Sequence, residues 1–388
     1  MFPKLSPLSF GFAARVAAVY GGLFMWGGIQ LPYFPLWLKA KGLDAREIGI
    51  VLAAPMVVRL FAIPAAARIA ERTGALRGMI SIALAVATVG YVAVGLANGF
   101  LAILVLFALA SFAVSPASPL TDTYALHGLG QRNRAYGPVR LWGSVAFVVG
   151  TFLAGYAVDA FPAHDLIWLM VAASLLSAVA AFALEPMNFA PHAPSLGQSR
   201  RLLTNPAFLA VTAASGLIQG SHAVYYGFSA LDWSKAGLDG TTIAMLWALG
   251  VFAEIALFAA QGRLPLSITP VLLLAVGGAG AALRWLVMAF DPPPAALPAL
   301  QLLHGLSFGA THLGAMALLV KIAPQGRSAS AQGFYAIGLG AIMAAMMSLS
   351  GWLYATYGAA AYGAMALSAV AGCACAAIAH HARQRAMA

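Results

Sequence analysis

Long apolar stretches recur along the whole chain, and short polar segments separate them. A helix of roughly 20 residues is enough to cross a lipid bilayer. Stretches of about this length or more lie at 10–38, 46–70, 78–97, 100–126, 138–160, 164–184, 206–231, 240–261, 266–290, 295–320, 328–355 and 358–380. Their glycines and prolines do not weaken a helical interpretation, because lipid offers the backbone no alternative to a helix. The pattern therefore predicts an all-α integral membrane protein with about twelve transmembrane helices.

A polar segment with helix-breaking residues divides these stretches six and six. It covers 186–205 and contains three prolines, a glycine and an arginine pair. We therefore predict an N-terminal six-helix bundle over 1–185, a cytoplasmic linker over 186–205 and a C-terminal six-helix bundle over 206–388. Two pseudo-symmetric bundles of this kind, with a site near the membrane midplane, are the layout of a secondary transporter.

The composition excludes a soluble domain, because 62% of the residues are hydrophobic and only 8% are charged. The net charge of +10 would suit a nucleic-acid partner, so the placement of the basic residues decides. The segments predicted to be cytoplasmic hold Lys4, Arg15, Arg68, Arg72, Arg77, Arg132, Arg134, Arg200, Arg201, Arg263, Lys321, Arg327, Arg383 and Arg385. The outer loops hold only Lys39, Lys41, Arg46 and Lys235. This asymmetry follows the positive-inside rule with both termini cytoplasmic, and it needs no nucleic acid.

Several strongly ionisable side chains lie inside the apolar stretches. Such groups are costly in hydrocarbon, so membrane proteins keep them where they face a protein interior or a water-filled cavity and have a function there. They are Arg59, Asp122, Arg140, Glu254, Arg284 and His304. Three arginines face two acids, which leaves one cation without a fixed partner. A bound anion would complete the set, as water or helix C-termini also could, and the imbalance favours a monocarboxylate ligand.

The loop after the second apolar stretch carries a recognisable motif. It reads Glu71-Arg72-Thr73-Gly74, with Arg77 three residues further on, and it resembles the acidic-Arg-x-Gly-basic loop of the major facilitator superfamily. The resemblance implies a cytoplasmic gate formed by Glu71, Arg72, Gly74 and Arg77, in which charged side chains bind helix ends. Glu71 stands where that loop usually has aspartate.

Four further segments sharpen the resemblance. They are VRLWGSVAFVVG (139–150), GSHAVYYGFSALDW (220–233), LWALGVFAEI (246–255) and LRW (283–285). Together they are similar to the phenylpropionate/proton symporter family, which is related to lactose permease. The spacings from Asp122 to Arg140 and from Arg284 to His304 match the lactose permease pattern, but Ser307 replaces an acid of that pattern. The resemblance implies a multi-pass, monomeric protein of the bacterial inner membrane, with the lipid bilayer as its surroundings.

Asp122 and Arg140 should lie at similar depth, because a short loop joins their helices, and they can form an ion pair. In one interpretation the pair only orients two helices, although buried pairs often add little net stability. In the other, Arg140 exchanges Asp122 for a substrate carboxylate. A guanidinium group suits that role because its planar fork binds a carboxylate through two hydrogen bonds.

Glu254 has apolar neighbours and no cation within one turn of its helix. Desolvation favours the neutral carboxyl, so Glu254 could exchange a proton at physiological pH, or stay protonated and hydrogen-bonded to another helix. Arg284 and His304 are its expected partners. For His222 and His312, a hydrogen-bonded core histidine is the favoured interpretation over a proton carrier.

Aromatic residues near these groups could supply the apolar part of a pocket. His222, Tyr225 and Tyr226 share a helix face because they are three and four residues apart. The residues predicted to bind substrate are Arg140, Arg284, Arg59, Gln30, His222, Tyr225, Tyr226 and Trp247, and those predicted to couple transport to protons are Glu254, Asp122 and His304.

The sequence thus predicts a proton-coupled symporter that imports a small aromatic or lipophilic monocarboxylate such as 3-phenylpropionate. The alternatives are a proton symporter for a neutral nucleoside or sugar, and a proton-driven multidrug exporter. Residues 143–158 lack the proline that superfamily antiporters carry at this place, which disfavours the exporter. No nucleotide-binding loop, catalytic triad or cluster of metal ligands is recognisable, so we expect no enzyme activity, no metal and no cofactor other than the proton as coupling ion.

Overall fold

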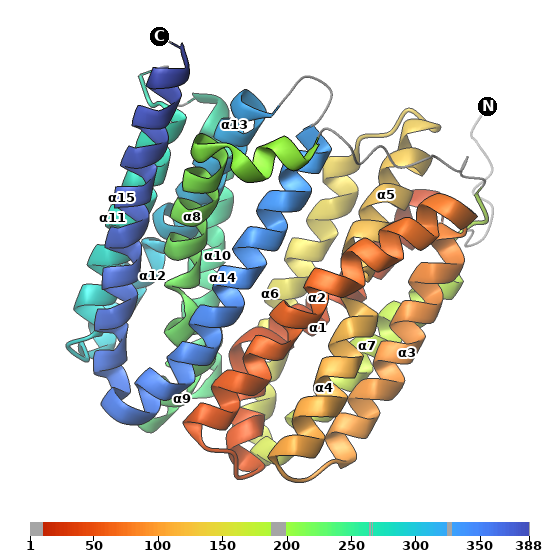
Figure 1. Ribbon diagram of the computed structural model, residues 1–388. Helices are drawn as coiled ribbons and strands as arrows, with labels where there is room; N and C mark the ends of the chain where they lie inside the picture. The colour runs from red at the N-terminus through yellow and green to blue at the C-terminus, as the bar shows by residue number, and fades with distance from the viewer. Residues whose placement is uncertain (1–10, 188–198, 264, 266, 324–327, 388) are drawn as a thin grey trace, which may run out of the picture. The chain divides into compact units, whose positions relative to one another are not determined.

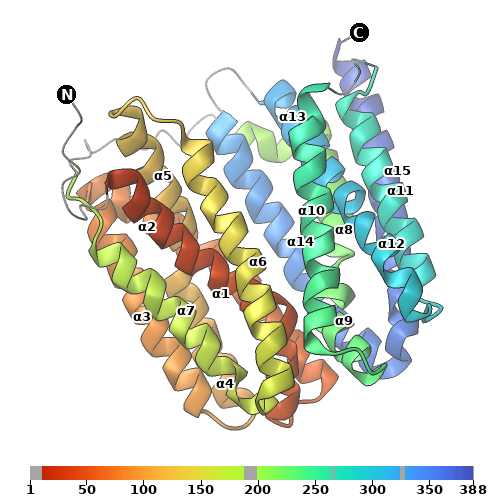
Figure 2. The same ribbon diagram turned by 180° about the vertical axis from the view of Figure 1, so that it is seen from behind.

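The computed structural model describes residues 11–187, 199–263, 265, 267–323 and 328–387, which form helices and no strand (Figures 1 and 2). Eleven segments of this part of the chain are long and apolar enough to cross a membrane. The last, Ala331–His381, has 51 residues, and η6 (Gly358–Ala361) divides it between α14 and α15. Since roughly 20 residues make one crossing, the prediction of an all-helical membrane protein with about twelve transmembrane helices is confirmed.

Most helices match the predicted stretches to within a few residues. Up to the linker they are α1 (Phe12–Ala40), α2 (Ala45–Thr73), α3 (Leu76–Leu96), α4 (Phe100–Val114), α5 (Ala117–Gly130), α6 (Tyr136–Ala160) and α7 (Leu166–Phe182). After it come α8 (Pro206–Gly220), α9 (Ala223–Lys235), α10 (Gly240–Ala260), α11 (Pro270–Met288), α12 (Leu297–Leu302), α13 (Thr311–Ile322), α14 (Ser328–Tyr357) and α15 (Tyr362–Met387). Short 3-10 segments are η1 (Ala163–Asp165), η2 (Ser199–Thr204), η3 (Gln261–Arg263) and η4 (Pro294–Ala296), and η5 (Gly305–Ala310) is a π-helix.

The chain forms two compact units. The first contains Met1–Phe34 and Phe61–Pro194, and the second contains Pro35–Leu60 and Ser195–Ala388. The helices α1 and α2 therefore contribute to both units. The division at 1–185, 186–205 and 206–388 remains a prediction, because most of the linker, 188–198, lies outside the described residues.

In the first unit, small residues let α1 lie directly against α6. A Cβ atom at Gly28 would overlap the backbone carbonyl of Phe147, and the hydroxyl of Thr151 donates a hydrogen bond of 3.0 Å to the carbonyl oxygen of Gly28. On the other side of the unit, the hydroxyls of Thr88 and Ser174 share a hydrogen bond of 2.8 Å between α3 and α7. Close approach through glycine is the usual way in which membrane helices associate, and it places the residues of α1 beside those of α6.

In the second unit, α8, α11 and α15 pack against one another, and the first half of α2 packs against α14. A Cβ atom at Gly49 would lie 2.7 Å from the Cα atom of Gly351, so these two helices touch through their backbones. Asp239 begins α10, since its carboxylate accepts a hydrogen bond of 2.6 Å from the backbone N–H of Thr242. This bond holds the pKa of the Asp239 carboxyl below its usual value.

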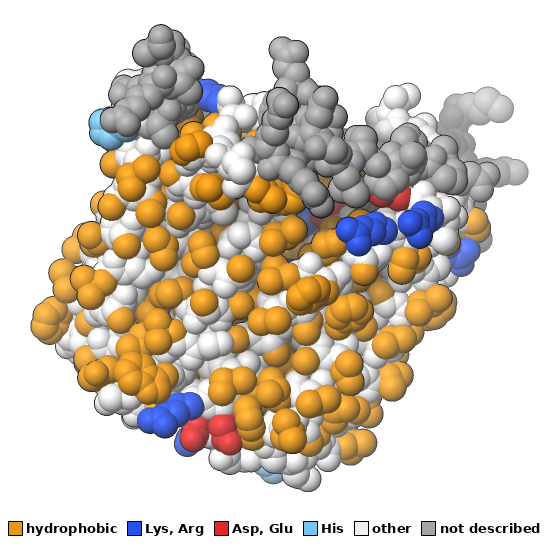
Figure 3. Space-filling model, viewed as in Figure 1, with side chains coloured by type: hydrophobic (Ala, Val, Ile, Leu, Met, Phe, Trp, Pro, Cys, Tyr) orange, Lys and Arg blue, Asp and Glu red, His pale blue; other side chains and the backbone are white. Residues whose placement is uncertain are grey.

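Apolar side chains cover the outside of the helices. Val89 of the first unit and Leu367 of the second are 70% and 71% exposed. On the face shown in Figure 3, hydrophobic side chains spread over the middle of the helices, and the visible charged side chains lie near helix ends. Such a surface suits lipid acyl chains, whereas a soluble protein would rarely expose so much apolar area.

Two stretches predicted as single helices are interrupted in the second unit. The stretch 206–231 divides into α8 and α9 at Ser221, whose hydroxyl donates a hydrogen bond of 2.6 Å to the carbonyl oxygen of Ile218. Side-chain bonds to the backbone of this kind compete with helical hydrogen bonds. The stretch 295–320 contains the π-helix η5, and such segments are frequent at functional sites. The interruptions adjoin His222 and His304, two histidines that the sequence singled out.

Candidate functional site

A buried guanidinium group forms the centre of a polar cluster in the second unit. Arg284 on α11 is fully buried. Its Nη1 lies 3.1 Å from Nδ1 of His304, and its Nη2 donates a hydrogen bond of 2.5 Å to Oε1 of Gln301. The guanidinium carbon lies 4.6 Å from the ring centre of Tyr225 and 4.5 Å from that of Trp285. Neutral acceptors and aromatic faces therefore surround this cation, and no carboxylate of the described residues forms an ion pair with it.

Glu254 on α10 lies next to this cluster. Its Oε2 is 3.9 Å from Nε2 of His304, and the Glu254 side chain is 21% exposed. Glycines make this approach possible: a Cβ atom at Gly250 would lie 3.3 Å from Cβ of His304, and one at Gly305 would lie 2.9 Å from the carbonyl oxygen of Ala253. His304 thus contacts Arg284 through Nδ1 and lies near Glu254 through Nε2. The sequence named both as charge partners of Glu254, but Arg284 forms no ion pair with Glu254 in the part of the chain that the structure describes.

His222 also lies beside His304, edge-on, with their ring centres 5.4 Å apart. Its Nδ1 faces the carbonyl oxygens of Ile218 and Gln219, and its Nε2 lies 3.0 Å from Oγ of Ser307. Every polar atom of this fully buried ring therefore has a partner. This arrangement agrees with the interpretation of His222 as a hydrogen-bonded core histidine, and it gives Ser307 a role in holding that ring.

The predicted aromatic residues lie together beside the polar cluster around Arg284. The rings of Tyr225 and Trp247 stack with their centres 4.5 Å apart, and Tyr226 lies 5.9 Å from Trp247. Trp285 joins this group at 5.8 Å from Tyr225, and its indole N–H donates a hydrogen bond of 2.8 Å to Oγ of Ser221. These rings give the polar cluster an apolar wall.

A second polar cluster lies in the first unit, around Asp122 on α5. Its Oδ1 accepts hydrogen bonds from the hydroxyls of Tyr20, at 2.6 Å, and Tyr136, at 2.8 Å. Arg140 stacks on aromatic rings instead, with its guanidinium carbon 3.9 Å from the ring centre of Phe24 and 5.3 Å from that of Tyr20. The predicted direct ion pair of Asp122 and Arg140 is not formed, and both tyrosine hydroxyls bind Oδ1 of the carboxylate instead. Within the described residues, the guanidinium of Arg140 has no hydrogen bond or ion pair.

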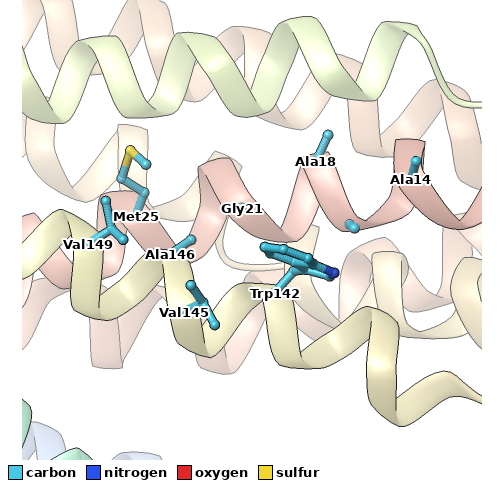
Figure 4. Close-up of a pocket in the computed structure, with 9 residues that line it drawn as sticks. Ala14, Ala18, Gly21, Met25, Trp142, Val145, Ala146 and Val149 are labelled. Carbon is cyan, nitrogen blue, oxygen red and sulfur yellow. The ribbon is translucent and has the colours of Figure 1, made fainter. Parts of the chain in front are cut away.

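An apolar groove lies between α1 and α6 of the same unit (Figure 4). Its volume is about 470 Å³, which is the size of a pocket for a small molecule. Figure 4 shows the ring of Trp142 lying along it, two residues after Arg140 on the same helix. The groove is lined by Ala14, Ala17, Ala18, Gly21, Met25, Trp142, Val145, Ala146 and Val149, none of them charged.

Two predicted binding residues stand apart from both clusters. Arg59, in the second unit, is exposed and donates only to Sδ of Met56, at 3.6 Å. Gln30, in the first unit, is partly buried and makes no hydrogen bond to a residue that the structure describes. The structure gives neither of them a contact with the predicted substrate-binding residues, so their roles remain predictions.

The predicted gate residues lie at the junction of α2 and α3. Gly74 ends α2 with a positive φ of 64°, a conformation that glycine adopts at low cost. The Arg77 guanidinium donates a hydrogen bond of 3.0 Å to the carbonyl oxygen of Phe182, at the C-terminus of α7, where a cation is favourable. Glu71 and Arg72 are exposed and form no ion pair within the described residues. Their role in gating remains a prediction.

The sequence interpretation missed several polar residues. Tyr20, Tyr136 and Gln301 carry no charge, and their only signal was a polar atom within an apolar stretch. Asp232 was overlooked because it follows the end of the stretch 206–231. Its Oδ1 accepts a hydrogen bond from the Tyr354 hydroxyl, which also accepts one of 3.0 Å from Lys235, and this links α9 to α14.

Comparison with known proteins agrees with this architecture. The chain is 33% identical over 349 residues to the "Probable 3-phenylpropionic acid transporter" of Escherichia coli (strain K12), covering 87% of this chain and 90% of that protein. It is 28% identical to the maltose permease of Geobacillus stearothermophilus, over 85% and 86% of the two chains. The crystal structure of the nucleoside transporter NupG has the same fold, with a TM-score of 0.81 at 14% identity, covering 96% of this chain and 99% of that chain.

These relatives are transporters rather than enzymes. The MFS_1 like family matches residues 14–363, which is nearly the whole chain. The chain therefore belongs to the MFS_1 like family, and it is a secondary transporter of the major facilitator type.

Proposed function

We propose that this transporter is a proton-coupled symporter that imports a small aromatic or lipophilic monocarboxylate, such as 3-phenylpropionate, by alternating access. The observation that carries the proposal is that Arg140 and Arg284, which lie in membrane-spanning helices and are not exposed, lack an ion-paired acid within the described residues. Embedded cations without a counter-ion are costly. A substrate carboxylate would supply the missing negative charge, whereas a neutral sugar or nucleoside would not.

Each unit contributes a different part of this function. In the first unit, Arg140 presents an unoccupied guanidinium beside Phe24, which suits two parallel hydrogen bonds to a carboxylate. In the second unit, Glu254 and His304 lie 3.9 Å apart and form the proton-binding pair, with Tyr225 and Trp247 as apolar surface. The similarity to a transporter described for 3-phenylpropionic acid supports an aromatic substrate.

Transport in proteoliposomes tests the proposal. With the outside acidic, 3-phenylpropionate should accumulate inside, and a protonophore should abolish the accumulation. Uridine and maltose, offered in parallel, should not accumulate. If either neutral solute accumulates and 3-phenylpropionate does not, the protein is a symporter for neutral solutes. Proton-driven extrusion of lipophilic compounds would instead make it an exporter.

We also propose that both termini and the gate residues Glu71, Arg72, Gly74 and Arg77 lie on the cytoplasmic side, because the basic residues concentrate in the corresponding segments. Fusion of alkaline phosphatase or of a fluorescent protein to the C-terminus tests the orientation. The fluorescent fusion should be bright and the phosphatase fusion inactive. The opposite pattern would refute this orientation.

A further inference from the structure

The hydrogen bond between Arg284 and His304 fixes which nitrogen of His304 carries the proton. A guanidinium group only donates hydrogen bonds and stays charged in proteins. The atom that faces it at 3.1 Å, Nδ1 of His304, must therefore accept. His304 is then neutral, with its proton on Nε2, the atom that lies 3.9 Å from Oε2 of Glu254.

Protonation of His304 is incompatible with this hydrogen bond. A proton on Nδ1 would set two donors and two positive charges against each other across 3.1 Å. The Nη1 group of the guanidinium would lose its acceptor, while Nη2 would keep Oε1 of Gln301. Its Nε already lacks a hydrogen-bond partner, although it is buried. A released Arg284 would thus hold at least two buried donor groups without acceptors, which is costly unless an anion binds.

The other groups around His304 allow it to take up a proton. Glu254 on α10 is the acid that faces the ring, and it can pair with an imidazolium. The ring of Phe308, from η5, stacks on His304 with centres 5.4 Å apart, and Tyr225 of α9 lies at 6.5 Å. His222 approaches edge-on at 5.4 Å, but its Nδ1 faces backbone carbonyl oxygens. Arg284 and Glu254 are therefore the charged groups that decide the protonation of His304.

We propose that His304 is a proton-operated switch for Arg284: a proton that binds to Nδ1 of His304 releases the guanidinium, which then binds the substrate carboxylate. This inference rests on the proposed proton-coupled uptake of a carboxylate. The only bond formed is N–H, and the proton comes from solvent and returns to it. In the loaded state His304 faces Glu254 as an imidazolium, and Arg284 faces the carboxylate. One proton and one negative charge enter together, so the net charge of the buried cluster stays constant.

Equilibrium binding of 3-phenylpropionate to the purified, full-length protein tests the switch. Histidine titrates within the range from about pH 6 to 8. If one proton is taken up with each carboxylate, the affinity of the wild type for 3-phenylpropionate should fall about tenfold for each unit by which the pH rises. His304→Asn keeps an acceptor for Arg284 but cannot be protonated. Its binding should not depend on pH, and at pH 6 it should be weaker than wild type by on the order of 10- to 100-fold.

His312→Asn is the matched control. His312 lies two turns after His304 and stacks on the same Phe308, at 6.4 Å, but its ring has no contact with Arg284. Its variant should keep the pH dependence of the wild type. If His304→Asn keeps that dependence too, the linked proton binds elsewhere and the switch is refuted. If the wild type binds no 3-phenylpropionate at any pH, the proposed function itself is wrong.

A second measurement needs no variant. Nuclear magnetic resonance of the wild-type protein with ¹⁵N-labelled histidine distinguishes the Nε2–H tautomer from the imidazolium. Adding saturating 3-phenylpropionate at neutral pH should convert one histidine from that tautomer to the imidazolium. If no histidine becomes protonated when the ligand binds, the switch does not exist.

Discussion

Arg140→Lys tests whether Arg140, like Arg284, contributes to carboxylate binding, because it keeps the charge and removes the planar fork. In the structure, the guanidinium carbon of Arg140 lies 3.9 Å from the ring centre of Phe24, and no acid of the described residues forms an ion pair with it. An ammonium group cannot reproduce two parallel hydrogen bonds. Loss of one charge-assisted bond costs roughly 1.5–3 kcal/mol, so the Kd for 3-phenylpropionate should rise about 10- to 150-fold.

The assay is equilibrium binding of labelled 3-phenylpropionate to purified protein, and Arg132→Lys is its matched control. Arg132 also stacks on a ring, 4.2 Å from the centre of Phe12, but its Nη2 is paired with Glu185 at 2.8 Å. That variant should bind as tightly as wild type. Asp122→Asn should change binding less than threefold or so, because Asp122 accepts from tyrosines rather than from Arg140. If Arg140→Lys binds within twofold of wild type, Arg140 does not contribute to carboxylate binding, and Arg284 must hold the carboxylate without it.

Other variants test the rest of the proposed arrangement. Glu254→Gln, which removes the carboxylate that faces the protonated His304, should abolish accumulation driven by a proton gradient but leave substrate exchange largely intact, because exchange requires no net deprotonation; normal accumulation would show that proton coupling does not depend on Glu254. Gly49→Ala should lower the thermal stability in detergent, since overpacking costs roughly 1–3 kcal/mol, whereas Gly78→Ala, with no atom within 4 Å of the added Cβ, should not; equal melting temperatures would contradict the close packing of α2 on α14. Tyr354→Phe should destabilise the protein by about 1–3 kcal/mol, because it leaves the half-buried Asp232 without its donor; an unchanged melting temperature would show that this link contributes little.

The sequence alone determined the class of fold and the location of the unusual charges. Lipid acts as an apolar solvent, so a helix that crosses it must be apolar over most of its length. Because of that constraint, membrane helices can be recognised in the sequence as apolar stretches such as 138–160. For the same reason, a charged residue within such a stretch, such as Arg140 or Glu254, can be identified from the sequence. The sequence also named Arg284 and His304 as partners of Glu254, but it did not predict that these two residues would contact each other, as they do at 3.1 Å.

Only the tertiary structure decided which partners these groups have. Asp122 could not be assigned to Tyr20 from the sequence, because the two lie 102 residues apart and tyrosines are common in membrane helices. The break at Ser221 was equally hidden, since it depends on side-chain bonds to the preceding turn. A buried polar atom takes whichever partner the packing of helices brings within reach. The acceptor role of His304, on which the coupling proposal depends, follows from that packing.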